Sequence, residues 1–185
     1  MHICGLQKTT LLDYPGKVAC TVFLGGCNFR CPFCQNSEIL SAASPAAYTE
    51  EELFAFLQKR RGILEGVCVS GGEPLLHEEA EGLLKKIKAF GYCVKVDTNG
   101  SFPARLKKLC AAGLVDFVAM DIKNSPAKYA QTCGAAVELA AVRESAAFLL
   151  EGGVDYEFRT TVADELHTEE DMEEIGAWLA GAKRG

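Results

Sequence analysis

The chain has 185 residues, 49% of them apolar and 24% charged, so it is long enough to bury one sizeable core. Its 19 lysine and arginine residues face 25 aspartate and glutamate residues, and the net charge is -6. Basic residues form no cluster, so we expect no nucleic-acid partner. The sequence shows neither a signal peptide nor an apolar run of the roughly 18 residues that span a membrane, and we expect a cytoplasmic protein without a membrane partner.

Strand-like and helix-like segments alternate from residue 17 onward, which is typical of parallel βα units. The predicted strands are Val18–Leu24, Gly66–Ser70, Cys93–Asp97, Val115–Asp121 and Val154–Val162. The predicted helices are Thr49–Arg61, His77–Phe90, Pro103–Ala112, Val137–Leu150 and Thr168–Ala180, and Gly91 and Gly113 stand where glycines end helices. We therefore predict a single α/β domain over residues 1–185, either a partial (β/α) barrel or an open doubly wound sheet. In both, ligands bind at the carboxyl ends of the strands.

Nine cysteines are a high count for this length, and their number is odd. Because a disulfide scaffold is usually short and loop-rich, we expect these thiols to be reduced. The sequence 25–36, Gly-Gly-Cys-Asn-Phe-Arg-Cys-Pro-Phe-Cys-Gln-Asn, holds three of them just after the first strand. Thiolates are soft ligands for zinc or iron–sulfur clusters, and no neighbouring residue completes a familiar zinc pattern. We interpret the other six cysteines as small buried hydrophobic residues.

The turn Ser70-Gly71-Gly72-Glu73-Pro74 follows the second strand. Two glycines let a ligand approach the backbone closely, and the Glu73 carboxylate can accept a cationic amine. A Gly-Gly turn between a strand and a helix is also common for structural reasons alone.

Charged side chains end the fourth and fifth strands. Asp121 and Lys123 share one face of their strand while Ile122 points to the other, so the two charges can face one ligand. A simple ion pair is the alternative. Arg159 can fork onto a carboxylate at the mouth of a barrel, or it can pair with a carboxylate of its own strand. Asp97-Thr98-Asn99-Gly100 closes the third strand, where Asn-Gly is first of all a turn former.

The Cys-x3-Cys-x2-Cys loop, with the aromatic Phe33 before its last cysteine, resembles the hallmark of the radical S-adenosylmethionine (SAM) superfamily. The segment Leu12–Lys17, followed by a strand and Gly-Gly-Cys, is similar to the Asp-x-Pro-Gly element of the activases of glycyl radical enzymes. These include the pyruvate formate-lyase activating enzymes. Within that group, Lys8–Lys17 most resembles the activating proteins of anaerobic ribonucleoside-triphosphate reductases.

This resemblance implies an oxidoreductase that cleaves SAM at a [4Fe-4S] cluster and generates a glycyl radical on an anaerobic ribonucleotide reductase. It implies that Cys27, Cys31 and Cys34 are the cluster ligands and the catalytic residues. It also implies SAM contacts from Phe33, Gln35, Gly71, Gly72, Glu73, Thr98, Asp121, Lys123 and Arg159. For Phe33, ordinary packing under the loop is the alternative. A monovalent cation near Asp97 and Thr98 is a further expectation, and a small electron donor such as flavodoxin or ferredoxin is a second protein partner.

Two alternatives remain at this point. The chain could act on another glycyl radical enzyme or on a small molecule, or it could be a non-catalytic zinc or iron–sulfur module. The non-catalytic reading leaves Gly71–Glu73 and Asp121–Lys123 unexplained. By comparison with the radical SAM fold, we expect a partial barrel of parallel strands that lacks the sixth strand and is short at its C-terminus.

Overall fold

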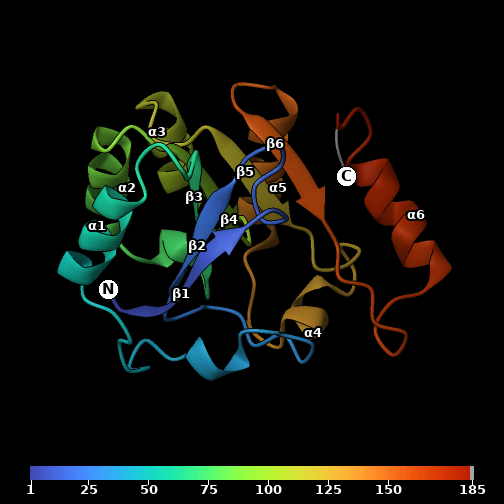
Figure 1. Cartoon of the computed structure of the whole chain (residues 1–185). Helices are drawn as coiled ribbons and strands as arrows, with labels where there is room; N and C mark the ends of the chain where they lie inside the picture. Colours follow the sequence, from blue (N-terminus) through green and yellow to red (C-terminus); the bar gives the residue numbers. More distant parts are fainter. Residues whose placement is uncertain (184–185) are drawn as a thin grey trace.

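The structure, a computed structural model, describes residues 1–183 and contains one six-stranded sheet in the order β1-β2-β3-β4-β5-β6 (Figure 1). Five strands run parallel: β2 (Ala19–Leu24), β3 (Gly66–Gly71), β4 (Cys93–Thr98), β5 (Phe117–Asp121) and β6 (Asp155–Arg159). They match the five predicted strands, and the expected α/β partial barrel is confirmed. The single-domain expectation for residues 1–185 stays a prediction, and residues 184 and 185 lie outside the described residues.

The sixth strand of the sheet, β1 (Ile3–Thr10), pairs antiparallel with β2 and was not predicted from the sequence. Its middle residues, Leu6 to Thr9, are half-buried or exposed, because β1 lies at the edge of the sheet. Edge strands lack the continuous apolar run that identifies a strand covered on both faces. The described residues thus contain five parallel strands and one antiparallel edge strand.

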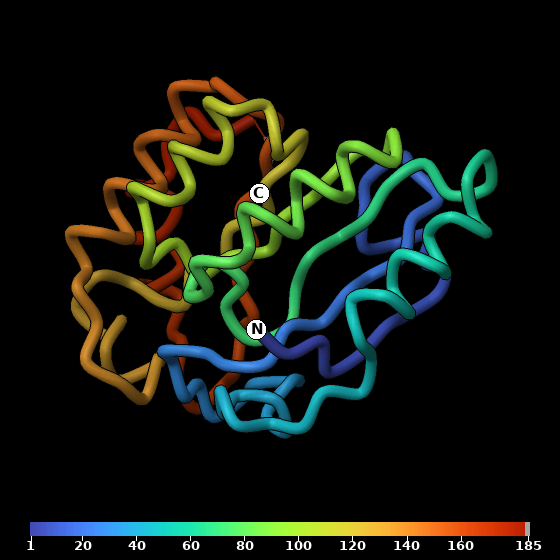
Figure 2. The backbone as a smooth tube through the Cα atoms, turned by 90° about the vertical axis from the view of Figure 1, so that its left-hand side faces the viewer, coloured from blue at the N-terminus to red at the C-terminus, as the bar shows by residue number. Residues whose placement is uncertain are grey.

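Five helices lie close to their predicted ranges: α1 (Glu50–Lys59), α2 (Ala80–Ala89), α3 (Pro103–Ala111), α5 (Leu139–Leu150) and α6 (Glu169–Trp178). Figures 1 and 2 show them arranged around the outside of the sheet. Thr49 opens α1 with a capping box, and Gly91 and Gly113 adopt positive φ angles of 88° and 66° after α2 and α3, as expected.

Three short elements were not predicted, namely α4 (Tyr129–Cys133) and the 3-10 turns η1 (Ser37–Ile39) and η2 (Pro74–Leu76). Helix α4 lies in the connection between β5 and α5. Five residues are too few to show a helical hydrophobic period, so α4 leaves no pattern in the sequence.

Strands β1 and β6 stand at opposite edges of the sheet, yet both contribute residues to the wall of one cavity. The sheet is therefore strongly curved. Gln7 of β1 and Arg159 of β6 both line it. The inner strands are covered on both faces, and four of the six residues of β3 are buried. Within residues 1–183, no helix is both long and apolar enough to cross a membrane.

Candidate active site

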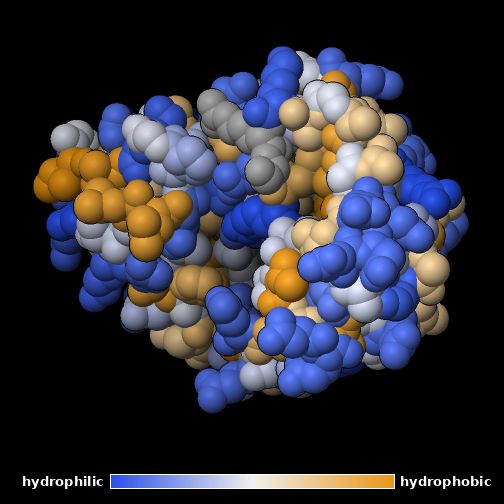
Figure 3. All heavy atoms as spheres, turned by 90° about the vertical axis from the view of Figure 1, so that its right-hand side faces the viewer, coloured by the Kyte–Doolittle hydropathy of each residue, from blue (hydrophilic) through white to orange (hydrophobic). Residues whose placement is uncertain are grey.

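The cavity has a volume of about 650 Å³ and lies at the carboxyl ends of the parallel strands. Figure 3 shows a face of the molecule that is hollowed at its centre, where hydrophilic residues are exposed. The structure brings eleven of the twelve predicted site residues to this cavity: Cys27, Cys31, Phe33, Cys34, Gln35, Gly71, Gly72, Thr98, Asp121, Lys123 and Arg159. Only Glu73 is absent from its wall. Residues far apart in the sequence therefore meet where the parallel fold predicts a ligand site.

The cysteine loop after β2 is held by main-chain hydrogen bonds to two neighbouring segments and by a turn of its own. Gly26 N and Cys27 N donate to the carbonyl groups of residues 39 and 40, at and just after η1. Arg30 N donates to the Cys133 carbonyl at the end of α4, with an N to O distance of 2.7 Å, and Cys34 N closes a turn on the Cys31 carbonyl. These hydrogen bonds tie the loop to η1 and α4.

All three thiols of the loop are half-buried and line the cavity. Burial raises the pKa of Cys27 to about 11. Within residues 1–183, no three His, Cys, Asp or Glu side chains are grouped so that they could hold a single metal ion. Soft thiolates are the ligands that hold iron–sulfur clusters, and three of them at the rim of a large cavity fit the cluster that the sequence predicts.

Cys133, interpreted from the sequence as a buried hydrophobic residue, is buried but contacts the cysteine loop. Donation of the Cys133 S–H to the Cys31 sulfur lowers the pKa of Cys31 against the opposing effect of burial. Sequence reasoning missed this contact because α4 was itself not predictable. The expectation of burial also holds for Cys20 and Cys68, whereas Cys4, Cys93 and Cys110 are half-buried.

Gly71 and Gly72 bring the end of β3 against the start of the cysteine loop. A Cβ atom on Gly71 would overlap the main chain of Leu24, and one on Gly72 would overlap the Gly26 carbonyl oxygen. Gly71 also has a φ angle of 119°, which side chains rarely adopt. Only glycine therefore permits this close approach, and Asn36 adds a hydrogen bond of 2.9 Å from Nδ2 to the Gly71 carbonyl.

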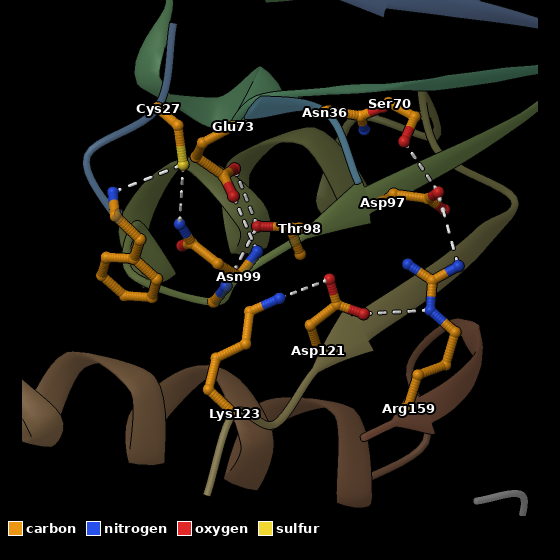
Figure 4. Close-up of polar contacts among 12 residues, drawn as sticks. Cys27, Asn36, Ser70, Glu73, Asp97, Thr98, Asn99, Asp121, Lys123 and Arg159 are labelled. Atoms are coloured by element: carbon orange, nitrogen blue, oxygen red, sulfur yellow. Dashed lines mark hydrogen bonds and ion pairs between the residues drawn. The ribbon is translucent and has the colours of Figure 1, made fainter. Parts of the chain in front are cut away.

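Glu73 does not take the position that the sequence predicted. Its carboxylate is fully buried and accepts a hydrogen bond from the main-chain N–H group of Leu75. It also accepts from the main-chain N–H group of Asn99 and from Thr98 Oγ1 (Figure 4). Burial raises the pKa of Glu73 to about 7, although these hydrogen bonds act in the opposite direction. The side chain joins the turn after β3 to the end of β4, and it presents no free carboxylate to the cavity.

Asp121, Lys123 and Arg159 form a connected row of charges along the cavity wall (Figure 4). Lys123 Nζ lies 2.9 Å from Asp121 Oδ2, and Arg159 Nε lies 3.0 Å from Asp121 Oδ1. Burial alone would raise the pKa of Asp121, but the two cations lower it, so the carboxylate is held ionised. Ile122 is fully buried between Asp121 and Lys123, as strand alternation predicts.

The expectation of a monovalent cation near Asp97 and Thr98 finds no support. Thr98 Oγ1 donates to Glu73 at 2.9 Å instead of facing an ion. Asp97 has two cationic partners of its own, because Lys95 Nζ lies 2.5 Å from Oδ1 and Arg159 Nη1 lies 3.4 Å from Oδ2. The charge of this carboxylate is thus balanced by side chains.

The comparison with known families decides the broad identity of the chain. The model of the radical SAM superfamily matches residues 21–179, which contain the cysteine loop and all other predicted site residues. The chain belongs to the radical SAM superfamily. This membership implies a [4Fe-4S] cluster and SAM as cofactors, and the thiols at the cavity fit the cluster.

Two relatives of this radical SAM protein are similar over different lengths. It is 30% identical over 178 residues to a protein of Methanocaldococcus jannaschii described as a glycyl-radical enzyme activating enzyme, covering 94% of this chain and 73% of the relative. It is 38% identical over 94 residues to the 7-carboxy-7-deazaguanine synthase of Halobacterium salinarum. That match covers 49% of this chain and only 36% of the synthase.

Solved structures support the same fold. A domain of a pyruvate-formate lyase-activating enzyme from Bacteroides vulgatus superposes with a TM-score of 0.54 at 22% identity, covering 64% of this chain and 74% of that domain. SuiB of Streptococcus suis bound to S-adenosylmethionine superposes with a TM-score of 0.65 at 14% identity. The latter match covers 85% of this chain but 38% of SuiB, so the radical SAM protein spans well under half of that enzyme.

Two asparagines support the cluster loop of this radical SAM protein without having been predicted. Asn28, inside the loop, accepts a hydrogen bond of 2.9 Å from Asn99 Nδ2 after β4. Both lie in segments that the sequence marks as loops, but their pairing joins positions that are 71 residues apart. The ring of Phe33, predicted to lie beside the cofactor, faces the cavity and packs 6.3 Å from the ring of His167.

Proposed function

We propose that this chain reductively cleaves SAM at a [4Fe-4S] cluster and generates a glycyl radical on an anaerobic ribonucleotide reductase. The observation that carries the proposal is the single cavity that joins three half-buried thiols of a fixed loop to the charges of β5 and β6. The relative from Methanocaldococcus jannaschii, similar over 94% of this chain, supports an activating enzyme.

In this proposal Cys27, Cys31 and Cys34 are the ligands of the cluster. When bound, the reduced cluster would supply the electron that cleaves SAM and yields the 5′-deoxyadenosyl radical that takes hydrogen from a glycine. The chain holds the reactants in position and limits their contact with water. Hydrogen bonds from Gly26, Cys27 and Arg30 to their neighbours keep the thiols in place.

The remaining cavity residues are proposed to bind SAM. The main chain of Gly71 and Gly72 can approach the ligand because neither has a side chain. Asp121 can accept the cationic amine, and Lys123 or Arg159 can donate to the ligand's carboxylate. Glu73 supports this site from behind by holding the turn after β3 against β4.

The choice of an anaerobic ribonucleotide reductase as partner rests on the segment Lys8–Lys17. Its residues resemble the activating proteins of that reductase, and in the structure Asp13 of this segment lines the cavity. We further propose flavodoxin or ferredoxin as the electron donor, because the cluster must receive one electron for each cleavage.

The first experiment tests SAM cleavage. The protein is reconstituted anaerobically with iron and sulfide, reduced with dithionite and mixed with SAM, and 5′-deoxyadenosine is quantified. Cys31→Ala should lose the product, whereas Cys110→Ala, a matched change in α3 away from the cavity, should retain it. A parent protein with a full cluster and no 5′-deoxyadenosine would contradict the proposal.

A second experiment tests the target. The activated mixture is incubated with an anaerobic ribonucleotide reductase whose glycines carry deuterium at the α carbon. We expect a glycyl radical in the electron paramagnetic resonance spectrum and deuterium in the 5′-deoxyadenosine. Cleavage of SAM with neither result would leave the reaction type intact and contradict this partner.

Action on a small molecule is the second candidate function. The 38% identity to the 7-carboxy-7-deazaguanine synthase over about half of this chain favours it. Deuterium reaching 5′-deoxyadenosine from a labelled small molecule, and none from the labelled reductase, would favour this candidate over the activase.

A further inference from the structure

Lys95 of β4 is a charged residue that the proposed chemistry does not use. Its side chain has no exposed surface, although lysine is almost never fully buried unless it is paired. It stands two residues before Asp97 on the same strand, so both side chains point to the inner face of the sheet. Asp97 lines the cavity and Lys95 does not, which places Lys95 one layer deeper.

Four strands provide the surroundings of the Lys95 ammonium group. Its Nζ lies 2.5 Å from Asp97 Oδ1 and 3.7 Å from Glu157 Oε1 of β6. Cys68 Sγ of β3 is 4.0 Å away, and the ring centre of Phe117 in β5 is 6.0 Å away. Asp97 is therefore its closest partner.

Asp97 connects Lys95 to the cavity wall. Its second carboxylate oxygen accepts from Ser70 Oγ at 2.9 Å and lies 3.4 Å from Arg159 Nη1, and Arg159 in turn pairs with Asp121 (Figure 4). Charges thus alternate from Lys95 through Asp97, Arg159 and Asp121 to Lys123 at the cavity. Lys95 is the buried end of this row.

Removing the ammonium group would leave Asp97 with a single cationic partner. The Asp97 side chain is only 14% exposed, and a carboxylate so largely removed from water is costly without sufficient countercharge, so Asp97 would draw Arg159 toward itself or recruit a cation from solvent. The first response disturbs the Arg159–Asp121 pair, which lies at the proposed SAM site, whereas a small cation bound in place of the ammonium group leaves that pair intact.

We propose that Lys95 is a positioning residue, whose ammonium group serves as a permanent internal cation for Asp97 and thereby holds Arg159 and Asp121 in place at the cavity wall. Insofar as the ligand is SAM, this inference rests on the proposed function. The parent chain then needs no added monovalent cation, because its own lysine supplies the charge.

The test replaces Lys95 with methionine, which has a similar length and no charge. In cluster-loaded protein, Lys95→Met should raise the Kd for SAM about tenfold, as loss of an orienting partner does at other sites. Ammonium or potassium chloride should recover much of the affinity at constant ionic strength, whereas tetramethylammonium chloride, whose cation is too large for the buried site, should not. The SAM affinity of the parent should be the same in all three salts.

Thermal unfolding of the cluster-free protein provides a readout that is independent of SAM. Lys95→Met should unfold at a lower temperature than the parent, and ammonium should raise its midpoint more than tetramethylammonium does. The double variant Lys95→Met/Asp97→Asn lacks the nearest carboxylate and keeps only Glu157, which is farther from Nζ and more exposed, so its stability should depend on the cation much less than that of Lys95→Met. Lys107→Met, which removes an exposed ion pair with Glu144, is the matched control and should behave like the parent.

An unchanged SAM affinity in Lys95→Met would overturn the inference. So would a loss of SAM affinity that neither ammonium nor potassium restores, if the stability of the variant is also independent of the cation. If the parent itself fails to bind SAM, the proposed function fails. The unfolding experiment then still decides whether Lys95 balances the charge of Asp97.

Discussion

Replacing Glu73 with glutamine should remove a pH dependence of folding stability. Burial raises the pKa of this carboxyl from 4.5 to about 7 in the folded chain. Between these values the folded protein holds the proton while the unfolded chain has released it. The folded state therefore binds more protons than the unfolded state in this window. The contribution of Glu73 to the free energy of unfolding is fully present below about pH 4.5 and is lost as the pH rises to about 7.

The magnitude follows from the pKa difference. One pKa unit corresponds to about 1.4 kcal/mol, so a shift from 4.5 to about 7 is linked to roughly 3 kcal/mol of unfolding free energy. Glutamine does not titrate, and this contribution should disappear. The variant should also be less stable at low pH by about 1–3 kcal/mol, because its amide group cannot accept from the N–H groups of Leu75 and Asn99 simultaneously.

The assay is urea unfolding of the cluster-free protein under anaerobic conditions, followed by circular dichroism between pH 4.5 and about pH 7, the window set by the linkage. Glu78→Gln is the matched control, because the Glu78 side chain is 87% exposed and its variant should keep the parent's pH slope. Equal slopes for the parent and Glu73→Gln would refute the reasoning.

Three further substitutions test the packing of the site and the helix ends. Gly72→Ala should destabilise the fold by about 3 kcal/mol or more, because the new methyl group overlaps the Gly26 carbonyl. Gly82→Ala, in open space on α2, should instead stabilise the fold by up to about 1 kcal/mol. Urea unfolding measures both changes, and equal stabilities of the two variants would contradict the expected overlap. Arg159→Lys should weaken SAM binding about tenfold in equilibrium dialysis, because one ammonium group cannot replace a guanidinium that contacts two carboxylates; unchanged affinity would contradict the assigned role. Thr49→Ala should lower the stability by about 1 kcal/mol through loss of the α1 capping box, and an unchanged unfolding midpoint would show that the box contributes little.

The sequence by itself determined the features that depend on local order. Apolar strand runs alternate with amphipathic helices, and this alternation is enough to predict five parallel strands and their helices. The three cysteines share one loop, so their spacing alone indicates a common metal centre, and superfamily membership supports that interpretation. The rule that ligands bind at the carboxyl ends of parallel strands then placed Gly71, Asp121 and Arg159 at one site before their distances were known.

Only the tertiary structure decided which side chains face the cavity and which support it from behind. Glu73 turns inward because three donors from β4 and the turn after β3 surround it, and no sequence pattern marks the positions of those donors. Cys133 reaches Cys31 through a helix too short to predict, and Lys95 meets Glu157 across strands separated by some sixty residues. The curvature of the sheet and the register of its strands set such contacts. They bring together residues that are far apart in the sequence, and no local sequence pattern records them.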